Sequence, residues 1–377
     1  MSDIFTFADE LGPLKVIHVQ EPAIGLKAVL VIDNVAKGPS IGGVRMASDV
    51  TTEECVRLAR AMTMKNAAGG LPHGGGKVVL KGDPKMPKSQ KAELLRCLAS
   101  ALRTEEDYIF APDMGTDEEC MAWIRDEIGR VVALPREIGG IPLDEIGATG
   151  WGLAHAAEVA AGFSDFKLAG ARVVVQGFGA VGRNVARFLA DKGCILVGAS
   201  DSRGSIQKPD GLDVESLIAL KSQGKSVADY PHGIRGDCDA IIDIECEIWI
   251  PAARPDVIHD DNVERLNTRL FLEGANIPAT VTAEARLFEK GILYIPDFIA
   301  NAGGVICAAM EYHGANESSA MATIKEKVSR NTRQVLERVR NEGIQPRQAA
   351  EKMALERVRK AMSFRRFSTF SMGPGYI

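Results

Sequence analysis

Gly177-Phe178-Gly179-Ala180-Val181-Gly182 is the stretch of sequence that decides the fold. It follows an apolar segment, 171–176, that is typical of a buried parallel strand, and it precedes a helical pattern over 183–192. In this setting the first glycine makes a tight turn, the second lets the backbone approach a pyrophosphate, and the third lets the helix pack on the strand. We therefore predict that all six residues bind a dinucleotide. The alternative is a glycine-rich turn in an unrelated doubly wound fold.

Asp201 indicates which dinucleotide binds, because it closes the next expected strand, 195–200. An acid at this place accepts hydrogen bonds from the ribose hydroxyls of NAD, and its charge repels the 2′-phosphate of NADP. Arg203 lies two residues further on and is able to pair with that phosphate. We expect NAD as the coenzyme, with NADP as the alternative, and we count Asp201, Ser202 and Arg203 as coenzyme-binding residues.

Strands and helices alternate after a glycine-rich segment, 139–152, that we expect to serve as a hinge. The expected strands of this half are 171–176, 195–200, 240–244, 248–250, 270–273 and 292–295. Before the hinge we expect strands at 27–33 and 108–111 and helices at 52–68, 89–103 and 117–130. The predicted fold class is α/β with two domains separated by a cleft. An N-terminal α/β domain covers 1–145, with helices of about 325–377 packing back on it, and a Rossmann-type doubly wound domain covers 146–324.

Composition narrows the class of partner. The 377 residues are 46% hydrophobic and 25% charged, with a formal charge of −5, which argues against nucleic acid or an anionic membrane as the main partner. The N-terminus shows no secretory signal, and no apolar run is long enough to span a bilayer. Seven scattered cysteines without a CxxC pair favour reduced thiols in a cytoplasmic protein, and the dispersed histidines predict no metal site.

Lys65 and Lys77 are embedded among small and apolar residues, where lysine is unusual. Three glycines precede Lys77 and remove side-chain bulk, so that a backbone or a ligand can approach closely. Two desolvated lysines in a protein that binds a nicotinamide coenzyme favour hydride transfer at a carbonyl or imine that is flanked by a carboxylate of the substrate. A carboxylic acid of the protein is then needed to move protons. Asp113 follows the strand 108–111 and is the best candidate. The alternatives are an exposed lysine after a glycine turn and an aspartate that caps a helix or forms a turn.

Five motifs occur in order: Lys65-Asn66, Gly74-Gly75-Gly76-Lys77, Asp113-Met114-Gly115-Thr116, Ala148-Thr149-Gly150-Trp151-Gly152 and Asn301-Ala302-Gly303-Gly304-Val305. Together they resemble the amino-acid dehydrogenase family of glutamate, leucine, phenylalanine and valine dehydrogenases. The match runs from about Gly38 to Glu311. The resemblance implies reversible oxidative deamination of an L-amino acid to a 2-oxo acid and ammonia. It also implies a homo-oligomer, with the first domain supplying the substrate site and most subunit contacts.

The resemblance also assigns roles by position. Lys65 would bind the substrate α-carboxylate, and Lys77 would polarise the 2-oxo group and hold the attacking water. Asp113 would exchange protons with the amine, the carbinolamine and water. The nicotinamide carboxamide would be positioned by Thr149 and Asn276, next to Ala275. Asn301 would sit at the base of the cleft, in reach of coenzyme and substrate.

The segment Gly38-Pro39-Ser40-Ile41-Gly42-Gly43 bears on the substrate, because the family's glutamate enzymes place a lysine where Ile41 stands. Those enzymes also have a serine where this chain has Ala308. A second carboxylate buried here without a partner would cost several kcal/mol. We therefore expect a branched-chain or aromatic side chain to be bound. The candidate substrate residues besides Lys65 are Ile41, Gly42, Gly43, Ala111, Asn301, Val305 and Ala308.

Other features keep alternatives open. Asp201-Ser202-Arg203-Gly204 and Glu273-Gly274-Ala275-Asn276 look more like the glutamate branch, and Lys37 lies near the pocket segment, where it would meet a polar substrate. Glutamate dehydrogenase is thus the first alternative. A non-catalytic dinucleotide sensor and an unrelated 2-hydroxyacid dehydrogenase are the others.

Overall fold

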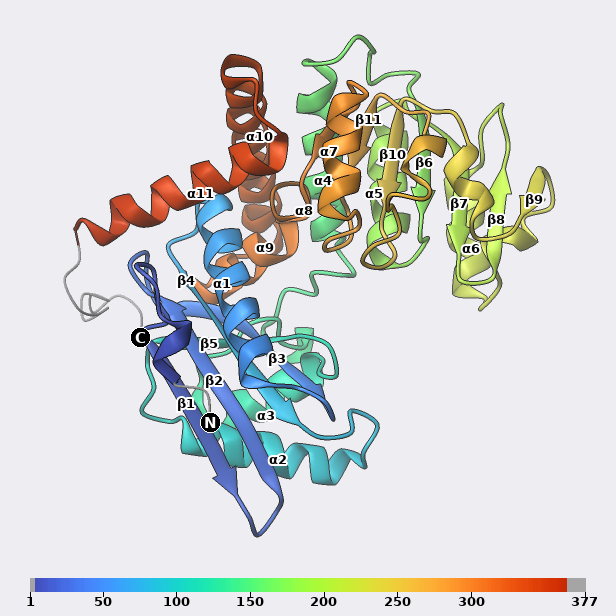
Figure 1. Cartoon of the computed structure of the whole chain (residues 1–377). Coiled ribbons are helices and arrows are strands. Elements are labelled where there is room, and N and C mark those ends of the chain that lie inside the picture. Colours follow the sequence, from blue (N-terminus) through green and yellow to red (C-terminus); the bar gives the residue numbers. More distant parts are fainter. Residues whose placement is uncertain (1–3, 365–377) are drawn as a thin grey trace. The chain divides into compact units, whose positions relative to one another are not determined.

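The computed structural model describes residues 4–364, and the chain divides into two compact units (Figure 1). The first unit comprises Met1–Pro142, Val305–Ala320 and Lys352–Ile377, and the second comprises Leu143–Gly304 and Met321–Glu351. The chain first passes from the first unit to the second within the glycine-rich segment 139–152, which was expected to be a hinge. The expected partition had its boundaries after residues 145 and 324. The tail beyond Phe364, part of the expected C-terminal packing, lies outside the described residues.

A five-stranded mixed sheet forms the centre of the first unit, in the order β1-β2-β4-β3-β5. Its strands are β1 (Lys15–Glu21), β2 (Leu26–Asn34), β3 (Ser40–Ala47), β4 (Gly74–Lys81) and β5 (Tyr108–Pro112). β3 runs parallel to both β4 and β5, whereas β2 is antiparallel to β1 and β4. The parallel trio brings the carboxyl ends of β3, β4 and β5 to one edge of the sheet.

Helices cover both faces of this sheet (Figure 1). They are α1 (Thr52–Ala68), α2 (Lys88–Ala101) and α3 (Glu118–Ile128), close to the expected ranges. Thr51 caps α1 by accepting a hydrogen bond from Glu54 N at 3.1 Å, and Asp117 caps α3. The residues Leu30, Val44 and Val78 and their alternating neighbours pack with α2 and α3. Val31 and Val79 pack with α1 on the opposite face.

This alternation fixes the direction of the candidate site residues. Successive side chains of a strand point to opposite faces, so Lys77 shares the face of Val79, which is the face covered by α1. Val44 pairs with Val78 in the α2/α3 core, and Gly43 pairs with Ala111 on β5. The face next to α1 therefore carries Ile41, Gly43, Arg45, Lys77 and Ala111, with Asp113 directly after β5.

The second unit contains a seven-stranded sheet in the order β12-β11-β10-β6-β7-β8-β9. Its strands are β6 (Arg172–Gln176), β7 (Ile195–Asp201), β8 (Gly204–Gln207), β9 (Ile234–Gly236), β10 (Ile248–Pro251), β11 (Leu270–Leu272) and β12 (Leu293–Ile295). The five strands from β12 to β7 are parallel, as in a Rossmann-type fold, and β8 and β9 extend the sheet with antiparallel pairs. The two-domain α/β fold class is confirmed.

The remaining helices complete the two units. They are α4 (Ala148–Ala161), α5 (Ala180–Asp191), α6 (Val214–Ser222), α7 (Val281–Glu289), α8 (Asp297–Ala300), α9 (Gly303–Tyr312), α10 (Glu317–Glu342) and α11 (Pro346–Met362). Short 3-10 turns are η1 (Ile4–Phe7), η2 (Arg136–Ile138), η3 (Val227–Asp229), η4 (Ala240–Asp243) and η5 (Val263–Arg265).

The predicted strand at 240–244 is wrong, because this segment forms the 3-10 turn η4. Asp237 Oδ1 accepts hydrogen bonds from the amides of Asp239 and Ala240, at 3.0 and 2.8 Å, and this bends the chain into a turn. Ile241 and Ile242 are nevertheless buried. A short buried apolar run has the same composition in a turn as in a strand, so the sequence pattern does not distinguish the two.

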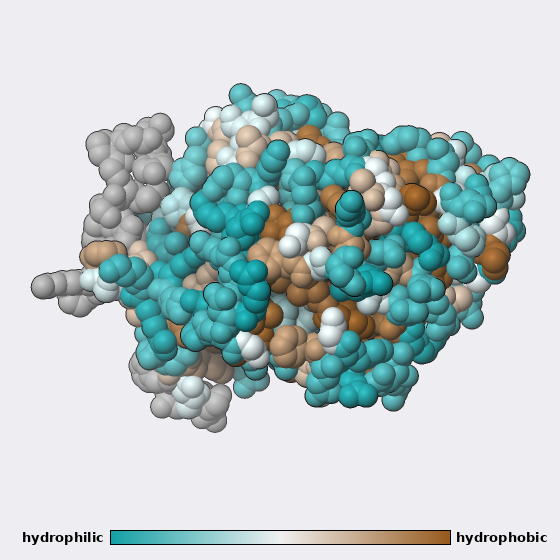
Figure 2. Space-filling view, turned by 90° about the horizontal axis from the view of Figure 1, so that it is seen from above, coloured by the Kyte–Doolittle hydropathy of each residue, from teal (hydrophilic) through white to brown (hydrophobic). Residues whose placement is uncertain are grey.

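The surface is mainly hydrophilic, as expected from the share of charged residues in the sequence. The face shown in Figure 2 is covered mainly by hydrophilic residues, with smaller hydrophobic patches between them. Within residues 4–364, no helix is long and apolar enough to cross a membrane, and no group of three or more metal-ligating side chains is placed to hold an ion. All seven cysteines, which lie in this range, are unpaired.

Candidate active site

The three glycines before Lys77 let other parts of the first unit approach β4 closely. A methyl group on Gly75 would come within 1.9 Å of Thr63 N in α1, and one on Gly74 within 1.8 Å of Asn34 O. At Gly76 it would lie 2.9 Å from the ring of Tyr108. The glycine run is therefore required by packing, and it presses α1 against the strand that carries Lys77.

Lys77 ends in an ion pair with Asp113. Its ammonium nitrogen lies 2.5 Å from Asp113 Oδ2, and the lysine is only 5% exposed. Arg45 Nε donates to the same oxygen at 3.0 Å, while Arg45 Nη1 reaches Glu54 at 2.7 Å. A side chain at Gly43 would collide with Asp113 Cβ at 2.6 Å, so Gly43 leaves the room in which the pair meets. The sequence predicted Lys77 and Asp113 as one catalytic pair, and the structure brings them into contact.

The charge state of Asp113 follows from these contacts. Burial alone would raise the pKa of its carboxyl, but Lys77, then the Met114 amide and Arg45, outweigh burial and lower it. Asp113 is therefore ionised at neutral pH and is able to act as a proton acceptor. The backbone supports its position, since Asp113 N donates to Thr116 Oγ1 at 3.0 Å.

Lys65 stands in the last turn of α1, two residues after the contact of Thr63 with Gly75, and it is half-buried. Its neighbour Asn66 is fully buried and donates from Nδ2 to Gly74 O at 2.6 Å, which ties the end of α1 to the beginning of β4. Lys65 thus belongs to the helix that covers the Lys77 face. The role of the two lysines on one substrate stays a prediction.

The candidate side-chain pocket residues come from two parts of the first unit. Ile41 is buried on the Lys77 face, and Ala111 is half-buried on the neighbouring strand. Val305 and Ala308 lie on α9 at the three-residue spacing that also leads to Glu311, so they share one side of the helix. Glu311 fixes α9 by accepting hydrogen bonds from the amides of Leu134 and Ile141, at 3.1 and 2.8 Å.

A histidine pair attaches the end of α9 to the start of β4. His73 Nε2 lies 3.0 Å from His313 Nε2, and His73 Nδ1 lies 3.1 Å from Pro39 O. Burial lowers the pKa of His73 to about 4, so the ring is neutral at neutral pH. α9 is thereby held beside Gly38-Pro39 and Gly74, the segments that lead into the two strands of the site.

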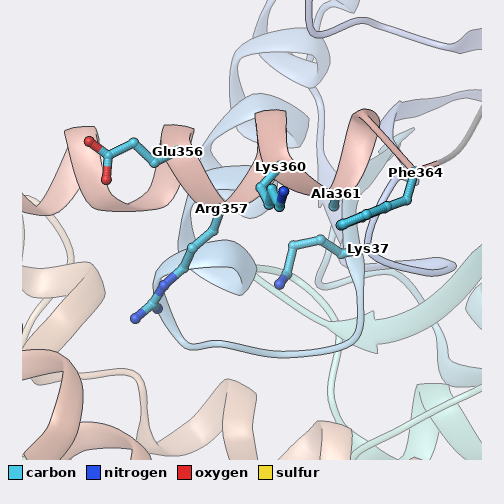
Figure 3. Close-up of a pocket in the computed structure, with 6 residues that line it drawn as sticks. All are labelled: Lys37, Glu356, Arg357, Lys360, Ala361 and Phe364. Carbon is cyan, nitrogen blue, oxygen red and sulfur yellow. The ribbon is translucent and has the colours of Figure 1, made fainter.

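Lys37, the other basic residue near the pocket segment, lines a different pocket (Figure 3). This pocket has a volume of about 440 Å³, and its other lining residues are on or just after α11: Glu356, Arg357, Lys360, Ala361 and Phe364. Arg357 also donates to Ala67 O and Ala68 O at the end of α1, at 3.2 and 2.7 Å. The structure therefore places Lys37 with the cations of α11.

The glycine turn of the second unit has the geometry that the sequence predicted. Gly177 has φ +93°, and a side chain on Gly182 would lie 2.0 Å from Gly177 O. A side chain on Gly179 would have no neighbour within 4 Å, and this residue begins α5 without a side-chain cap. The first N–H groups of α5 therefore have no side-chain cap, and such a helix start suits a pyrophosphate. The Phe178 side chain is buried, so this residue offers only its backbone.

Asp201 lies at the end of β7, as expected, but its carboxylate already accepts four hydrogen bonds. Oδ2 accepts from Lys221 Nζ at 2.7 Å and from Val227 N at 3.0 Å, and Oδ1 accepts from Ser226 Oγ at 2.7 Å and Arg203 N at 2.9 Å. Burial alone would raise the pKa of Asp201, but the bonds from Lys221 and Ser226 and the two amides lower it to about 2. A carboxylate has about four acceptor positions, so a ribose hydroxyl must replace one of these donors. The charge that was expected to repel a 2′-phosphate is paired with Lys221.

Thr149 and Asn301, the residues predicted to position the nicotinamide carboxamide, both lie near the start of α9. A side chain on Gly304 would lie 3.2 Å from Thr149 Oγ1, and one on Gly303 would lie 2.1 Å from Ala148 O, so α4 and α9 begin side by side. Asn301 donates to Gly274 O and Ala275 O at 3.3 Å and to Asn276 Oδ1 at 3.0 Å. Among the described residues its own Oδ1 is buried without a partner. An unsatisfied buried acceptor of this kind fits the N–H₂ donor of a nicotinamide carboxamide.

The sequence matches the family described as Glutamate/Leucine/Phenylalanine/Valine dehydrogenase over residues 139–366. Residues 13–130 match its N-terminal part, described as the Glu/Leu/Phe/Val dehydrogenase dimerisation domain. The chain belongs to this family. It is an amino-acid dehydrogenase and hence an oxidoreductase, and its relatives include NAD-specific and NADP-specific enzymes.

Three relatives illustrate the range of this family. The amino-acid dehydrogenase is 37% identical to a glutamate dehydrogenase of Aeropyrum pernix, with 88% of this chain and 85% of the relative covered. It is 32% identical to the leucine dehydrogenase of Bacillus subtilis, with coverages of 95% and 94%. The hetero-hexameric glutamate dehydrogenase of Thermus thermophilus, solved in a leucine-bound form, superposes with a TM-score of 0.81 at 28% identity, covering 94% and 91%.

Several residues that shape the sites of this amino-acid dehydrogenase were missed in the sequence. Arg45 could have been found, because it lies two residues after Gly43 on one strand and must share its face. Glu311 and Lys221 gave no such signal, since their partners lie far away along the chain. Gln176, whose buried Oε1 has no partner among the described residues, ends β6 directly before the glycine turn.

Proposed function

We propose that this protein catalyses the reversible, NAD-dependent oxidative deamination of an L-amino acid with a branched-chain or aromatic side chain. The products are the 2-oxo acid and ammonia. The observation that carries the proposal is the contact of Lys77 with Asp113, at 2.5 Å, on the sheet face covered by the helix of Lys65. Few structural roles require a buried lysine paired with a half-buried carboxylate, next to a helix that carries a second lysine.

The residues of the first unit suit the successive steps. Lys65 binds the α-carboxylate of the substrate, and the ionised Asp113 takes a proton from the α-ammonium group. The bound coenzyme supplies the hydride acceptor for the α-carbon. Lys77 then holds the water that attacks the resulting iminium ion, and Asp113 passes its proton to the nitrogen as it takes one from this water. The carbinolamine hydroxyl gives its remaining proton to Asp113 as the C–N bond breaks and ammonia leaves, with Lys77 stabilising the oxygen. Because Lys77 and Asp113 are already in contact, a proton moves between them without a change of backbone position.

The coenzyme residues are proposed from the second unit. The turn from Gly177 to Gly182 and the start of α5 would hold the pyrophosphate, and Thr149, Asn276 and Asn301 would hold the carboxamide. For the adenosine ribose we propose Asp201, Ser202 and Arg203. Since Lys221 pairs with Asp201 and the exposed Arg203 follows, we propose that NADP is also accepted.

We propose that the side chain of the substrate binds in a pocket lined by Ile41, Ala111, Val305 and Ala308. Ile41 is buried on the Lys77 face, so a substrate carboxylate beside it would lose its water without gaining a cation. Lys37, which would be the nearest basic residue by sequence, lines the pocket formed with α11. An apolar group at this position meets no such cost.

L-glutamate is the second candidate, because the Aeropyrum pernix relative is a glutamate dehydrogenase at 37% identity. The test is a panel of 2-oxo acids with ammonia, each run with NADH and with NADPH. We expect branched or aromatic oxo acids to be reduced with the higher kcat/KM. Faster turnover of 2-oxoglutarate would reject the hydrophobic assignment, and turnover without ammonia would reject deamination.

Assembly and location complete the proposal. The Thermus thermophilus relative is a hetero-hexamer, and we propose a homo-oligomer for this chain with contacts made mainly by its first unit. A cytoplasmic location stays a prediction from the cysteine usage.

A further inference from the structure

A cluster of buried charged groups lies in the second unit, centred on Arg347, a residue that has no part in the proposed chemistry. Arg347, at the start of α11, donates from Nη2 to Glu273 at 3.2 Å, to Glu284 at 2.6 Å and to Asp297 at 3.2 Å. Its Nε reaches both oxygens of Glu284, at 2.9 and 2.6 Å. Glu273, Glu284 and Asp297 are 0%, 2% and 7% exposed. Four elements that are distant in the sequence therefore meet at one guanidinium.

The charges in this cluster do not balance if every carboxyl is ionised, because three would share one guanidinium. Glu273 is the carboxyl whose pKa changes most clearly. Burial, then the neighbouring carboxylate of Glu284, raise this pKa well above the ordinary 4.5, against the effect of Arg347. Its Oε1 is buried without a partner among the described residues, while Oε2 accepts from Asp297 N at 2.8 Å. The other titratable groups facing the cluster are Tyr294 and Glu351, both with raised pKa values.

This cluster is attached directly to the residues proposed to hold the nicotinamide. Glu273 is the residue before Gly274-Ala275-Asn276, and Asp297 begins the helix that ends beside Asn301. Asp297 Oδ2 also accepts a hydrogen bond from Ile277 N at 3.0 Å.

Ile277 shows that this loop is held under strain. Its φ is +49°, a region that β-branched residues avoid, and it is 57% exposed, so packing does not hold it there. Two hydrogen bonds hold it: Ile277 N donates to Asp297, and Ile277 O accepts from Asp256 N at 2.9 Å. Asp297 is held in turn by Arg347. A continuous set of contacts thus runs from Arg347 through Asp297 to the backbone next to Asn276.

We propose that Arg347 is a positioning residue for the nicotinamide end of the coenzyme, acting through Glu273 and Asp297 on the loop of Asn276 and on Asn301. The inference rests on the proposed function for the nicotinamide contacts. It concerns a residue on a C-terminal helix, more than forty positions after the last motif of the family resemblance. A guanidinium is needed because it donates in several directions from one plane, which an ammonium cannot reproduce.

The experiment compares Arg347→Met and Arg347→Lys with the surface control Arg286→Met in the same unit, where Arg286 pairs with Glu264 and Glu289. Binding of NADH and of ADP-ribose, which lacks the nicotinamide, is measured well below the Tm of each variant. We expect Arg347→Met to weaken NADH binding about tenfold while ADP-ribose binding changes less than about twofold. Arg347→Lys should fall between, and Arg286→Met should match the wild type.

Steady-state kinetics give the second readout. In Arg347→Met, kcat/KM for the coenzyme should fall about tenfold or more, with the KM of the amino acid nearly unchanged. A folded Arg347→Met variant that binds NADH as the wild type does, or that loses NADH and ADP-ribose equally, overturns the inference. Absence of turnover in the wild type would instead reject the proposed function, and the NADH/ADP-ribose comparison would still test Arg347.

Glu273→Gln tests whether this carboxyl is neutral. The amide has the same shape and no charge, so at pH 7 its NADH affinity should lie within about twofold of the wild type. The stability contributed by neutral Glu273 is full below its unfolded pKa and is lost as pH rises toward its raised folded pKa, so thermal stability should fall less with pH in the variant. A variant as damaged as Arg347→Met would show that the charge is required and would overturn this assignment.

Discussion

The two units each contain a cluster built around an arginine and carboxylates, and the clusters differ in burial and in charge balance. In the first unit Arg45 and Lys77 share the carboxylate of Asp113, whose side chain is 23% exposed. In the second unit Arg347 serves three carboxyls that are almost fully buried. In the first cluster two cations contact Asp113, and Glu54 pairs with one of them, so the charges balance. In the second cluster three carboxyls share one cation.

This difference agrees with the roles proposed for the two clusters, catalysis for the first and support of the coenzyme loop for the second. Cations around Asp113 keep it ionised, and partial exposure leaves room for a substrate to displace one of them. Burial and the neighbouring carboxylate of Glu284 raise the pKa of Glu273, and the same burial leaves no room for a ligand. Perturbed carboxyls in a protein therefore indicate function only when their exposure is considered as well.

The largest effect is expected from Lys77→Ala. Without its ammonium group the carbinolamine oxygen and the water lose their partner, so kcat should fall about a thousandfold or more. NADH binding, measured by fluorescence, should stay within about twofold, because the coenzyme residues are unchanged. Lys81→Ala, at the exposed end of the same strand, is the matched control. Turnover close to wild type in Lys77→Ala would remove the catalytic role.

Arg347→Met should produce the largest loss of stability. It leaves Glu284 and Asp297 buried without their cation, which costs about 3–5 kcal/mol in the free energy of unfolding. Urea denaturation monitored by circular dichroism measures this loss. A loss below 1 kcal/mol, the scale typical of exposed ion pairs, would mean that water or rearrangement satisfies both acids.

Ile41→Lys combined with Ala308→Ser should change the substrate specificity of the enzyme, because both residues belong to the proposed side-chain pocket. A lysine beside Lys77 supplies a partner for a second carboxylate, so the ratio of kcat/KM for 2-oxoglutarate over a branched oxo acid should rise about a hundredfold. Ala308→Ser alone serves as the control and should change the ratio much less. An unaltered ratio in the double variant would place the side-chain pocket elsewhere.

Arg45→Met should have the smallest effect on stability, about 1 kcal/mol, because its ion pairs are partly exposed.

The same variant should also change the pH dependence of the reaction. Arg45 lowers the pKa of Asp113, so its removal moves that pKa upward. The ionised base is present above this pKa and is lost as pH falls through it. The acid limb of kcat/KM should therefore shift to higher pH in Arg45→Met, and an unshifted limb would exclude Asp113 as the titrating base.

The sequence predicted those parts of the sites that depend on neighbouring residues. The turn from Gly177 to Gly182, the glycine run before Lys77 and the strand before Asp113 are local patterns, and each has the expected geometry. Arg347 and Glu311 could not be predicted, because their roles depend on partners that folding brings from distant segments. Asp201 lay between these cases: its place at the end of a strand was predicted, but its four donors were not.

The interleaved connectivity of the two units has a consequence for synthesis on the ribosome. When residues 1–142 have emerged, the amides of Leu134 and Ile141 still lack Glu311, and the carbonyls of Ala67 and Ala68 still lack Arg357. The N-terminal sheet is thus translated long before the segments that complete it. Nascent chains stalled after residue 142 should therefore be more sensitive to protease than chains released at full length.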